Sequence, residues 1–168
     1  MQASDIKGRA VVTLADAAKV GTVDDILFDP RYQRVEGFVL KEGRIGGSKA
    51  AIPRGRVKAI GPDAVTVASA EEIGPTSRFS ELQNTRSLGQ AQGTKVVTEK
   101  GELLGTLDGF ELDDEMREVR TCRLATPLLG RLLNRQDTFV PQHIRQVGEG
   151  GLMVVDDDAL RSDSTNGE

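Results

Sequence analysis

The side chains able to do chemistry in this chain are few and are scattered along it. His143 is the only histidine, so a metal site made of several histidines cannot form. A nucleophile–histidine pair cannot occur more than once in the chain either. Cys122, the only cysteine, falls at an apolar position of an expected strand, where a buried thiol behaves as a small hydrophobic side chain. We therefore expect a surface or half-buried imidazole at His143, no catalytic residue and no enzyme activity.

Two acidic groups could supply oxygen ligands to a divalent cation: Asp24-Asp25 and Asp113-Asp114-Glu115. Neither group has the spaced ligand loop of a dedicated calcium site, so we interpret both as solvated turns. The glycine-rich stretch Gly43–Gly47 has no following helix whose N-terminus could hold a phosphate. The sequence thus predicts neither a metal site nor a cofactor.

A stretch rich in leucine lies within residues 126–135 of the second half. Four leucines in a loop are difficult to explain as solvent-facing side chains. They could close the open end of a small barrel or pack against the first half, or they could form an exposed patch rimmed by arginines that binds a partner. The sequence leaves both alternatives open. The candidate interaction residues are Leu128, Leu129, Arg131, Leu132, Leu133 and Arg135.

The composition of the chain argues against several classes of function. The net charge is −4, the basic residues are scattered, and aromatic residues make up 4% of the chain, which disfavours a nucleic-acid surface. One cysteine allows no intramolecular disulfide, which is typical of a reducing cytoplasm. No apolar run approaches the roughly 20 residues of a membrane helix, and we recognise no signal peptide. We expect a cytoplasmic protein without membrane insertion or direct nucleic-acid binding.

The elements that would position these residues occur twice. Gly21-Thr22-Val23-Asp24 recurs as Gly105-Thr106-Leu107-Asp108, an offset of 84 residues, and Val35 recurs as Val119 at the same offset. Self-similarity of this kind indicates two copies of one folding unit. Units of about sixty residues are marginally stable alone, so we expect the copies to pack on each other or the chain to self-associate. Two further matches relate residues 8–13 to 93–98 and Ile52-Pro53 to Val140-Pro141.

Each copy is expected to consist of short strands separated by glycine, aspartate and proline turns. The strands expected in the first copy are Ala10–Leu14, Val20–Phe28 and Val35–Leu40, and those in the second are Thr94–Thr98, Leu104–Leu112 and Glu118–Leu124. In each long strand, strict alternation would place Val23 and Leu107 on the wrong face. One extra residue at Asp24-Asp25 and at Asp108-Gly109 would correct this, so we predict a β-bulge at both places.

We predict an all-β fold with two tandem small barrels, at residues 1–70 and 93–156. Residues 71–92 are polar and rich in glycine, serine and glutamine, so we expect a linker there, with a short helix around 80–85. Residues 157–168 are acidic and poor in apolar side chains, so we expect a disordered tail.

The first copy resembles the PRC-barrel family, which includes the cytoplasmic part of the photosynthetic reaction-centre H subunit and the C-terminal domain of the ribosome maturation factor. The resemblance depends on the order and spacing of residues within Gly21–Asp29, Val35–Leu40 and Ile52–Val67. The second copy keeps Gly105–Asp108 and Val140-Pro141. The family implies small β-barrels that dock on a larger assembly, although a fold does not determine a function.

These observations lead to the hypothesis of a non-catalytic adaptor of a bacterium or archaeon, which binds another protein or forms a homodimer. The family resemblance leaves two alternatives open. One is an accessory role in ribosome or RNA maturation, and the other is an accessory role in photosynthetic or membrane electron transport.

Overall fold

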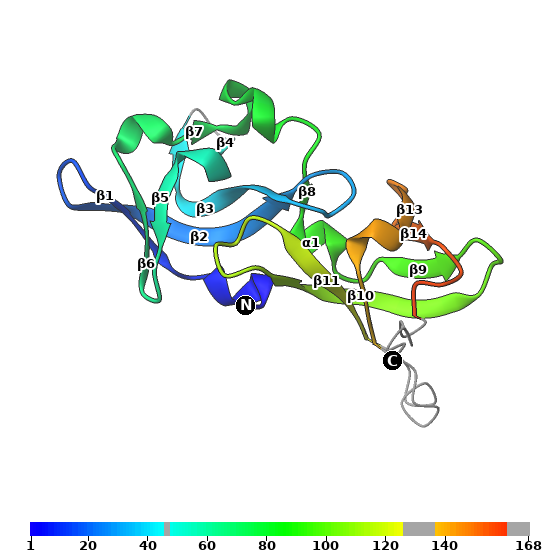
Figure 1. Ribbon diagram of the computed structural model, residues 1–168. Helices are drawn as coiled ribbons and strands as arrows, with labels where there is room; N and C mark the ends of the chain where they lie inside the picture. Colours follow the sequence, from blue (N-terminus) through cyan, green and yellow to red (C-terminus); the bar gives the residue numbers. More distant parts are fainter. Residues whose placement is uncertain (46–47, 126–136, 161–168) are drawn as a thin grey trace.

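The computed structural model describes residues 1–45, 48–125 and 137–160, and for residues 42–48 it describes no side chains. The described part is all-β, as the sequence predicts, and is organised in two sheets, one of them curled into a half-barrel (Figure 1). The one α-helix in these residues, α1, is a single turn at Leu88–Ala91. The other helical segments of the described chain are short 3-10 turns.

The first sheet has eight strands in the order β5-β6-β1-β2-β3-β4-β7, with β8 paired to β2. The pairing of β1 with β6 is parallel, and the other pairings are antiparallel. The strands are β1 (Ala10–Thr13), β2 (Ala18–Phe28), β3 (Val35–Ile45), β4 (Ser48–Pro53), β5 (Val57–Ile60), β6 (Ala64–Val67), β7 (Gly74–Pro75) and β8 (Arg86–Ser87).

The second sheet has six strands in the order β12-β11-β10-β9-β14-β13, with a parallel pairing between β9 and β14. When β9–β14 are matched in turn to β1–β6, the two sheets have the same strand order. In the described residues no pairing joins the outer strands of either sheet, so the structure confirms two sheets but not the two tandem barrels that the sequence predicts. The strands are β9 (Lys95–Thr98), β10 (Leu103–Leu112), β11 (Val119–Ala125), β12 (Thr138–Phe139), β13 (Ile144–Val147) and β14 (Leu152–Val155).

Both predicted β-bulges are confirmed. In the first sheet, the pairing of β2 with β3 shifts register between Val23 and Asp25. In the second sheet, the pairing of β10 with β11 shifts between Leu107 and Gly109. The extra residue turns the apolar side chains on both sides of the bulge to one face, and all six of them are at most 2% exposed: Val23, Ile26, Phe28, Leu107, Phe110 and Leu112.

The two halves meet through contacts that are reciprocal. The Val35 amide donates to the carbonyl oxygen of Arg117 at 2.8 Å, and the Val119 amide donates to the carbonyl oxygen of Gln33 at 2.9 Å. Between these bonds, Arg34 forms an antiparallel bridge with Glu118. The two bonds are equivalent, because Val35 and Val119 occupy matching positions in the two halves, as do Gln33 and Arg117. This is the pattern of an approximate two-fold axis between the halves.

The segment that precedes each sheet pairs with the other sheet. Ahead of the first sheet, Gln2 forms a bridge with Glu111 of β10, and the Leu112 amide donates to the Met1 carbonyl at 2.8 Å. Ahead of the second sheet, β8 pairs with the end of β2, with Phe28 opposite Arg86. The chain predicted to be a linker therefore contains two strands of the first sheet, β7 and β8. It also contains a 3-10 turn, η5 (Ser80–Leu82), where a short helix was expected.

The apolar residues of both halves form one continuous core. At its centre, the Phe110 ring of the second half lies 4.8 Å from Phe28 and stacks at 5.1 Å on Tyr32, both from the first half. The long hairpins β2–β3 and β10–β11 meet in the middle of the molecule, with β1, β5 and β6 at one end and β9, β13 and β14 at the other (Figure 1). The expectation that the copies pack on each other is confirmed.

The predicted correspondence between Pro53 and Pro141 is wrong by one residue. Pro53 is the N-cap of the 3-10 turn η2 (Arg54–Arg56), whereas Pro141 is the first residue of the turn η6 (Pro141–His143) and Val140 is its N-cap. The structural counterpart of Pro53 is therefore Val140. The sequence comparison aligned the two prolines because proline is the more conspicuous residue, but the first turn of a helical segment accepts it at either position.

Candidate functional site

Two equivalent turns bring polar side chains to the junction of the halves. The Asp29 carboxylate accepts hydrogen bonds from the amides of Gln33 and Arg34, both at 2.7 Å. In the second half, Asp113 accepts from the amides of Arg117 at 2.7 Å and Glu118 at 3.1 Å. An aspartate that bonds to its own backbone in this way stabilises a tight turn. The acidic residues at these turns therefore have a structural role.

Each turn also inserts one large side chain into the shared core. Tyr32 and Met116 occupy equivalent positions, are at most 1% exposed, and have positive φ angles of 55° and 52°. Residues of this size are uncommon in the left-handed region, because their β-carbon crowds the backbone. The conformation is held by burial of the side chain, and it fixes where the flanking residues Arg34 and Arg117 lie.

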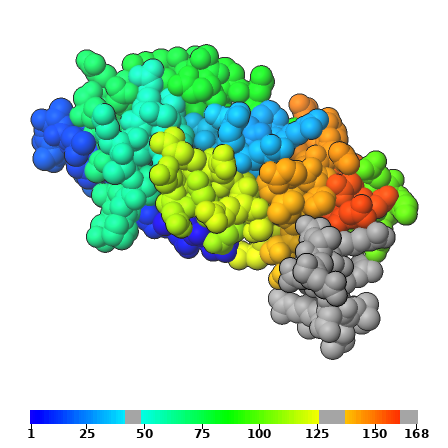
Figure 2. All heavy atoms as spheres, viewed as in Figure 1, coloured from blue at the N-terminus to red at the C-terminus, as the bar shows by residue number. Residues whose placement is uncertain are grey.

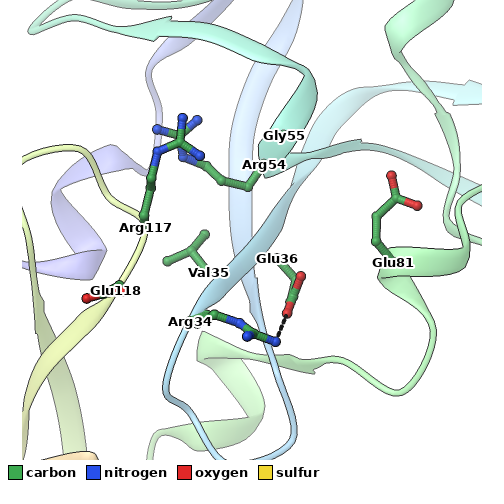
Figure 3. A pocket seen from close by; sticks show the side chains of 8 residues that line it. All are labelled: Arg34, Val35, Glu36, Arg54, Gly55, Glu81, Arg117 and Glu118. Carbon is green, nitrogen blue, oxygen red and sulfur yellow. Dashed lines mark hydrogen bonds and ion pairs between the residues drawn. The ribbon is translucent and has the colours of Figure 1, made fainter.

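Between the two turns lies a pocket of about 480 Å³. Its lining comes from the first-half turn and β3, from η2, from η5 and from the second-half turn, so it exists only when the halves are together (Figure 3). Figure 2 shows the second-half segment around residues 111–120 against the first-half segment around residues 50–60. The pocket is lined by Arg34, Val35, Glu36, Arg54, Gly55, Glu81, Arg117 and Glu118.

Arg54 is the most deeply buried of the charged lining residues, with 8% of its surface exposed. Its Nε donates to the carbonyl oxygen of Met116 at 3.2 Å, and its Nη2 donates to the carbonyl oxygen of Glu115. Both acceptors belong to the second half, so this first-half side chain also joins the halves. Burial lowers the pKa of Arg54, and the nearby charge of Arg117 lowers it further, although arginine stays protonated at any physiological pH.

The other charged side chains of the pocket are more exposed. Arg34 pairs with Glu36 at 3.3 Å, and Arg117 pairs through its Nε with Glu115 at 3.2 Å. In Figure 3 the guanidinium groups of Arg54 and Arg117 lie side by side at one end of the pocket. The carboxylate of Glu81 is on the opposite side of the pocket. Exposed ion pairs of this kind contribute little to stability. The two arginines can therefore leave these carboxylates and bind another acceptor in the pocket.

A second hollow of about 440 Å³ lies beside β8. Arg86 lines it, and the Nη2 of this residue donates to the carbonyl oxygen of Val147 at 3.2 Å. The Nε of Arg86 is the one buried side-chain nitrogen or oxygen without a partner in the part of the chain that the structure describes. The remaining lining residues are Pro30, Asn84, Thr85, Gln90 and Glu149.

The residues singled out for catalytic chemistry are placed as follows. Cys122 is fully buried opposite Phe139 of β12, and burial strongly raises the pKa of its thiol, which confirms its position in the core. His143 is half-buried, as expected, with its Nδ1 2.7 Å from the Asp156 carboxylate. These two side chains lie in different surroundings and do not form a common site.

The acidic groups serve local structure. Asp24 binds the Lys49 ammonium at 2.7 Å, and this hydrogen bond lowers the pKa of Asp24. Asp25 accepts a hydrogen bond from the Ile26 amide at 2.8 Å, and Asp113 holds its turn. Within residues 1–45, 48–125 and 137–160, no three histidine, cysteine, aspartate or glutamate side chains are grouped to hold a metal ion.

The six candidate interaction residues of the leucine-rich stretch lie outside the described residues: Leu128, Leu129, Arg131, Leu132, Leu133 and Arg135. Their role stays a prediction. The site that sequence reasoning missed is the pocket around Arg54. Its one sequence signal is an arginine directly after the Ile52-Pro53 strand end, where the second copy has no charged residue.

The fold and the pocket define an all-β protein whose two open sheets share one core and one charged cavity. No helix in the described part of the chain is long and apolar enough to cross a membrane. Residues 1–73 match the family model of the PRC-barrel domain, and this match covers β1–β6 of the first sheet. It supports the family resemblance for the first half, whereas residues 74–168 lie outside it. No curated protein matches the chain.

Proposed function

We propose that this protein is a non-catalytic adaptor built from two PRC-type β-barrel units, which binds another protein or a second copy of itself. The observation that carries the proposal is the junction pocket, because both halves contribute charged side chains to it. A site of this kind explains why two copies are fused: neither half could form it alone.

The equivalence of the halves supports the description as two units. Both sheets follow one strand order, both long strands are bulged at equivalent positions, and the contacts at the junction are reciprocal. The shared core makes the pair a stiff platform, and a preformed surface loses less conformational entropy on binding than a flexible one. This property suits a protein that docks on a larger assembly.

The leucine-rich stretch provides the second element of the proposal. Its four leucines and two arginines have the composition of an interface, where apolar side chains are surrounded by charged ones. We propose that Leu129 and Leu132 contact the partner protein or the second copy.

The test is to replace Leu129 and Leu132 by aspartate together. A matched control replaces Leu103 and Leu152, which are 57% and 44% exposed in the second sheet, by aspartate. The molar mass is measured by light scattering across a range of protein concentrations, and partners are captured from the native organism and quantified by mass spectrometry. We expect the first variant to lose the association and the control to keep it, with both variants folded.

Retention of partner and mass by the Leu129→Asp, Leu132→Asp variant would show that the stretch belongs to the core. Co-purification with ribosomal particles, or with electron-transport subunits in membrane fractions, would instead favour one of the two alternative roles named by the family resemblance.

A further inference from the structure

The guanidinium group of Arg54 has unused hydrogen-bonding capacity. A guanidinium carries five N–H donors, and in the described residues Arg54 uses one on Nε and one on Nη2. No hydrogen bond to Nη1 and no carboxylate within ion-pair distance of Arg54 occur in this part of the molecule. The carboxylates of Glu115 and Asp113 act on Arg54 only at longer range, where they raise its pKa against the lowering by burial and by Arg117. A buried charge that lacks a direct ion pair is costly.

The free donors of Arg54 face the pocket. If Nη1 were sealed in the protein, it would be a buried nitrogen without a partner, yet among the described residues only Nε of Arg86 is in that state. Nη1 therefore reaches accessible space. The space beside Arg54 is the junction pocket, of which it is a lining residue (Figure 3).

Three arginines and three glutamates line the pocket, so their charges cancel overall, but two of the arginines, Arg54 and Arg117, lie together at one end. Arg34 is paired with Glu36, and Arg117 is paired with Glu115. The charge of Arg117 acts on Arg54, and Figure 3 shows the two guanidinium groups at the same end. A single negative group placed there would neutralise Arg54 and could accept a hydrogen bond from Arg117.

The same charges select between possible anions. Glu81 and Glu118 also line the pocket, and they would repel a doubly charged phosphate more strongly than a singly charged carboxylate. A carboxylate is also the planar acceptor that a guanidinium binds through two parallel hydrogen bonds. The volume of about 480 Å³ exceeds what a lone carboxylate needs and leaves room for the chain that carries it.

We infer that the junction pocket binds the carboxylate of a glutamate or aspartate side chain from a partner protein, held by Arg54 and Arg117. This inference rests on the proposed adaptor function and specifies the chemistry of its recognition. The partner segment would enter past Glu81 and place its carboxylate against the Nη1 edge of Arg54.

The test uses the purified full chain and two blocked five-residue peptides, one with a central glutamate and one with glutamine there. Binding is followed by the NMR signal of the Arg54 Nε–H group, which its bond to Met116 protects from solvent. We expect the glutamate peptide to shift this signal and to bind at least about ten-fold more tightly than the glutamine peptide, because hydrogen bonds to charged groups are the stronger ones. Sodium acetate and inorganic phosphate are titrated in parallel.

Variants separate the pocket from general electrostatics. Arg117→Gln should weaken the glutamate peptide about ten-fold, whereas Arg120→Gln, an exposed residue of β11 outside the lining, should leave binding unchanged. Arg54→Lys keeps the charge but loses the planar donor pair, so it should also weaken binding. If Arg54→Lys fails to fold, the Arg117→Gln comparison still decides the question.

Equal affinity for both peptides, or equal loss in Arg117→Gln and Arg120→Gln, would overturn the inference. Acetate or phosphate binding as tightly as the glutamate peptide would overturn the assignment to a protein segment. These titrations do not involve the leucine-rich stretch. Loss of the leucine-stretch effect with successful titrations would therefore challenge that stretch as the interface, and failure of the titrations with successful partner capture would challenge the carboxylate site.

Discussion

The shared core predicts that the two halves unfold together, and Phe110 is the residue whose change tests this best. Its side chain is fully buried in the second half and contacts Phe28 and Tyr32 of the first half. Replacing a buried phenylalanine by alanine costs about 3–5 kcal/mol from lost burial and the cavity left behind. Domains of this size have a total stability of about 5–15 kcal/mol, so Phe110→Ala should remove a large share of it.

Tyr32 provides a probe for the junction, because it is the single tyrosine and the chain has no tryptophan. Tyrosine fluorescence therefore reports on the junction, while far-ultraviolet circular dichroism reports on the strands of both sheets. In a guanidinium titration of the wild-type protein we expect both signals to change in one coincident transition. In Phe110→Ala both midpoints should move together to lower denaturant.

Phe79→Ala is the matched control. Phe79 is also buried, but it packs in a separate small cluster of the first half with Leu27, Ala51 and Leu82. Its loss should also lower stability, and it should leave the native fluorescence of Tyr32 unchanged. The reasoning is refuted if Tyr32 fluorescence is lost well before the strand signal, since the halves would then unfold separately. A Phe110→Ala effect below about 1 kcal/mol would refute it as well.

Two further predictions concern single positions. Gly37→Ala should destabilise the fold, because a β-carbon there would lie 2.5 Å from the Ile52 carbonyl oxygen. Gly55→Ala is the control: its β-carbon meets nothing within 4 Å, so the thermal midpoint should change little. Equal midpoints for the two variants would contradict this reasoning. The Cys122 thiol should resist alkylation until unfolding. Burial raises the pKa of Cys122, so above about pH 9 only the unfolded protein ionises this thiol. The free energy of unfolding should therefore fall by about 1.4 kcal/mol per pH unit above that pH. Cys122→Ala should lack this slope.

Much of the local structure could be predicted from the sequence. The positions of the strands follow from alternation of apolar and polar residues, and the bulges follow from the one place in each long strand where the alternation fails. Each of these patterns involves residues within about ten positions of one another in the chain. A β-bulge of one residue also shifts the apolar pattern by a fixed amount. The repeat added the prediction that the two halves have similar structures, because similar sequences form similar folding units.

The candidate site could not be predicted in the same way. Arg54 is recognised as unusual only by its surroundings: its two acceptors are carbonyl groups that lie far along the chain, in the turn before β11. The sequence shows an arginine next to a proline, which is typical of many surface turns. Burial, and the lack of a carboxylate within ion-pair distance among the described residues, are properties of the packed structure.

The sequence by itself determined that the chain is all-β and that its two long strands are bulged at two known positions, because those features depend on near neighbours. Only the tertiary structure decided that the leading segment of each half pairs with the other sheet, that Tyr32 and Phe110 share one core, and that both halves enclose the arginine pocket. The physical reason is that backbone pairing and burial between distant segments are set by the packing of the two units, which no local pattern in either unit encodes.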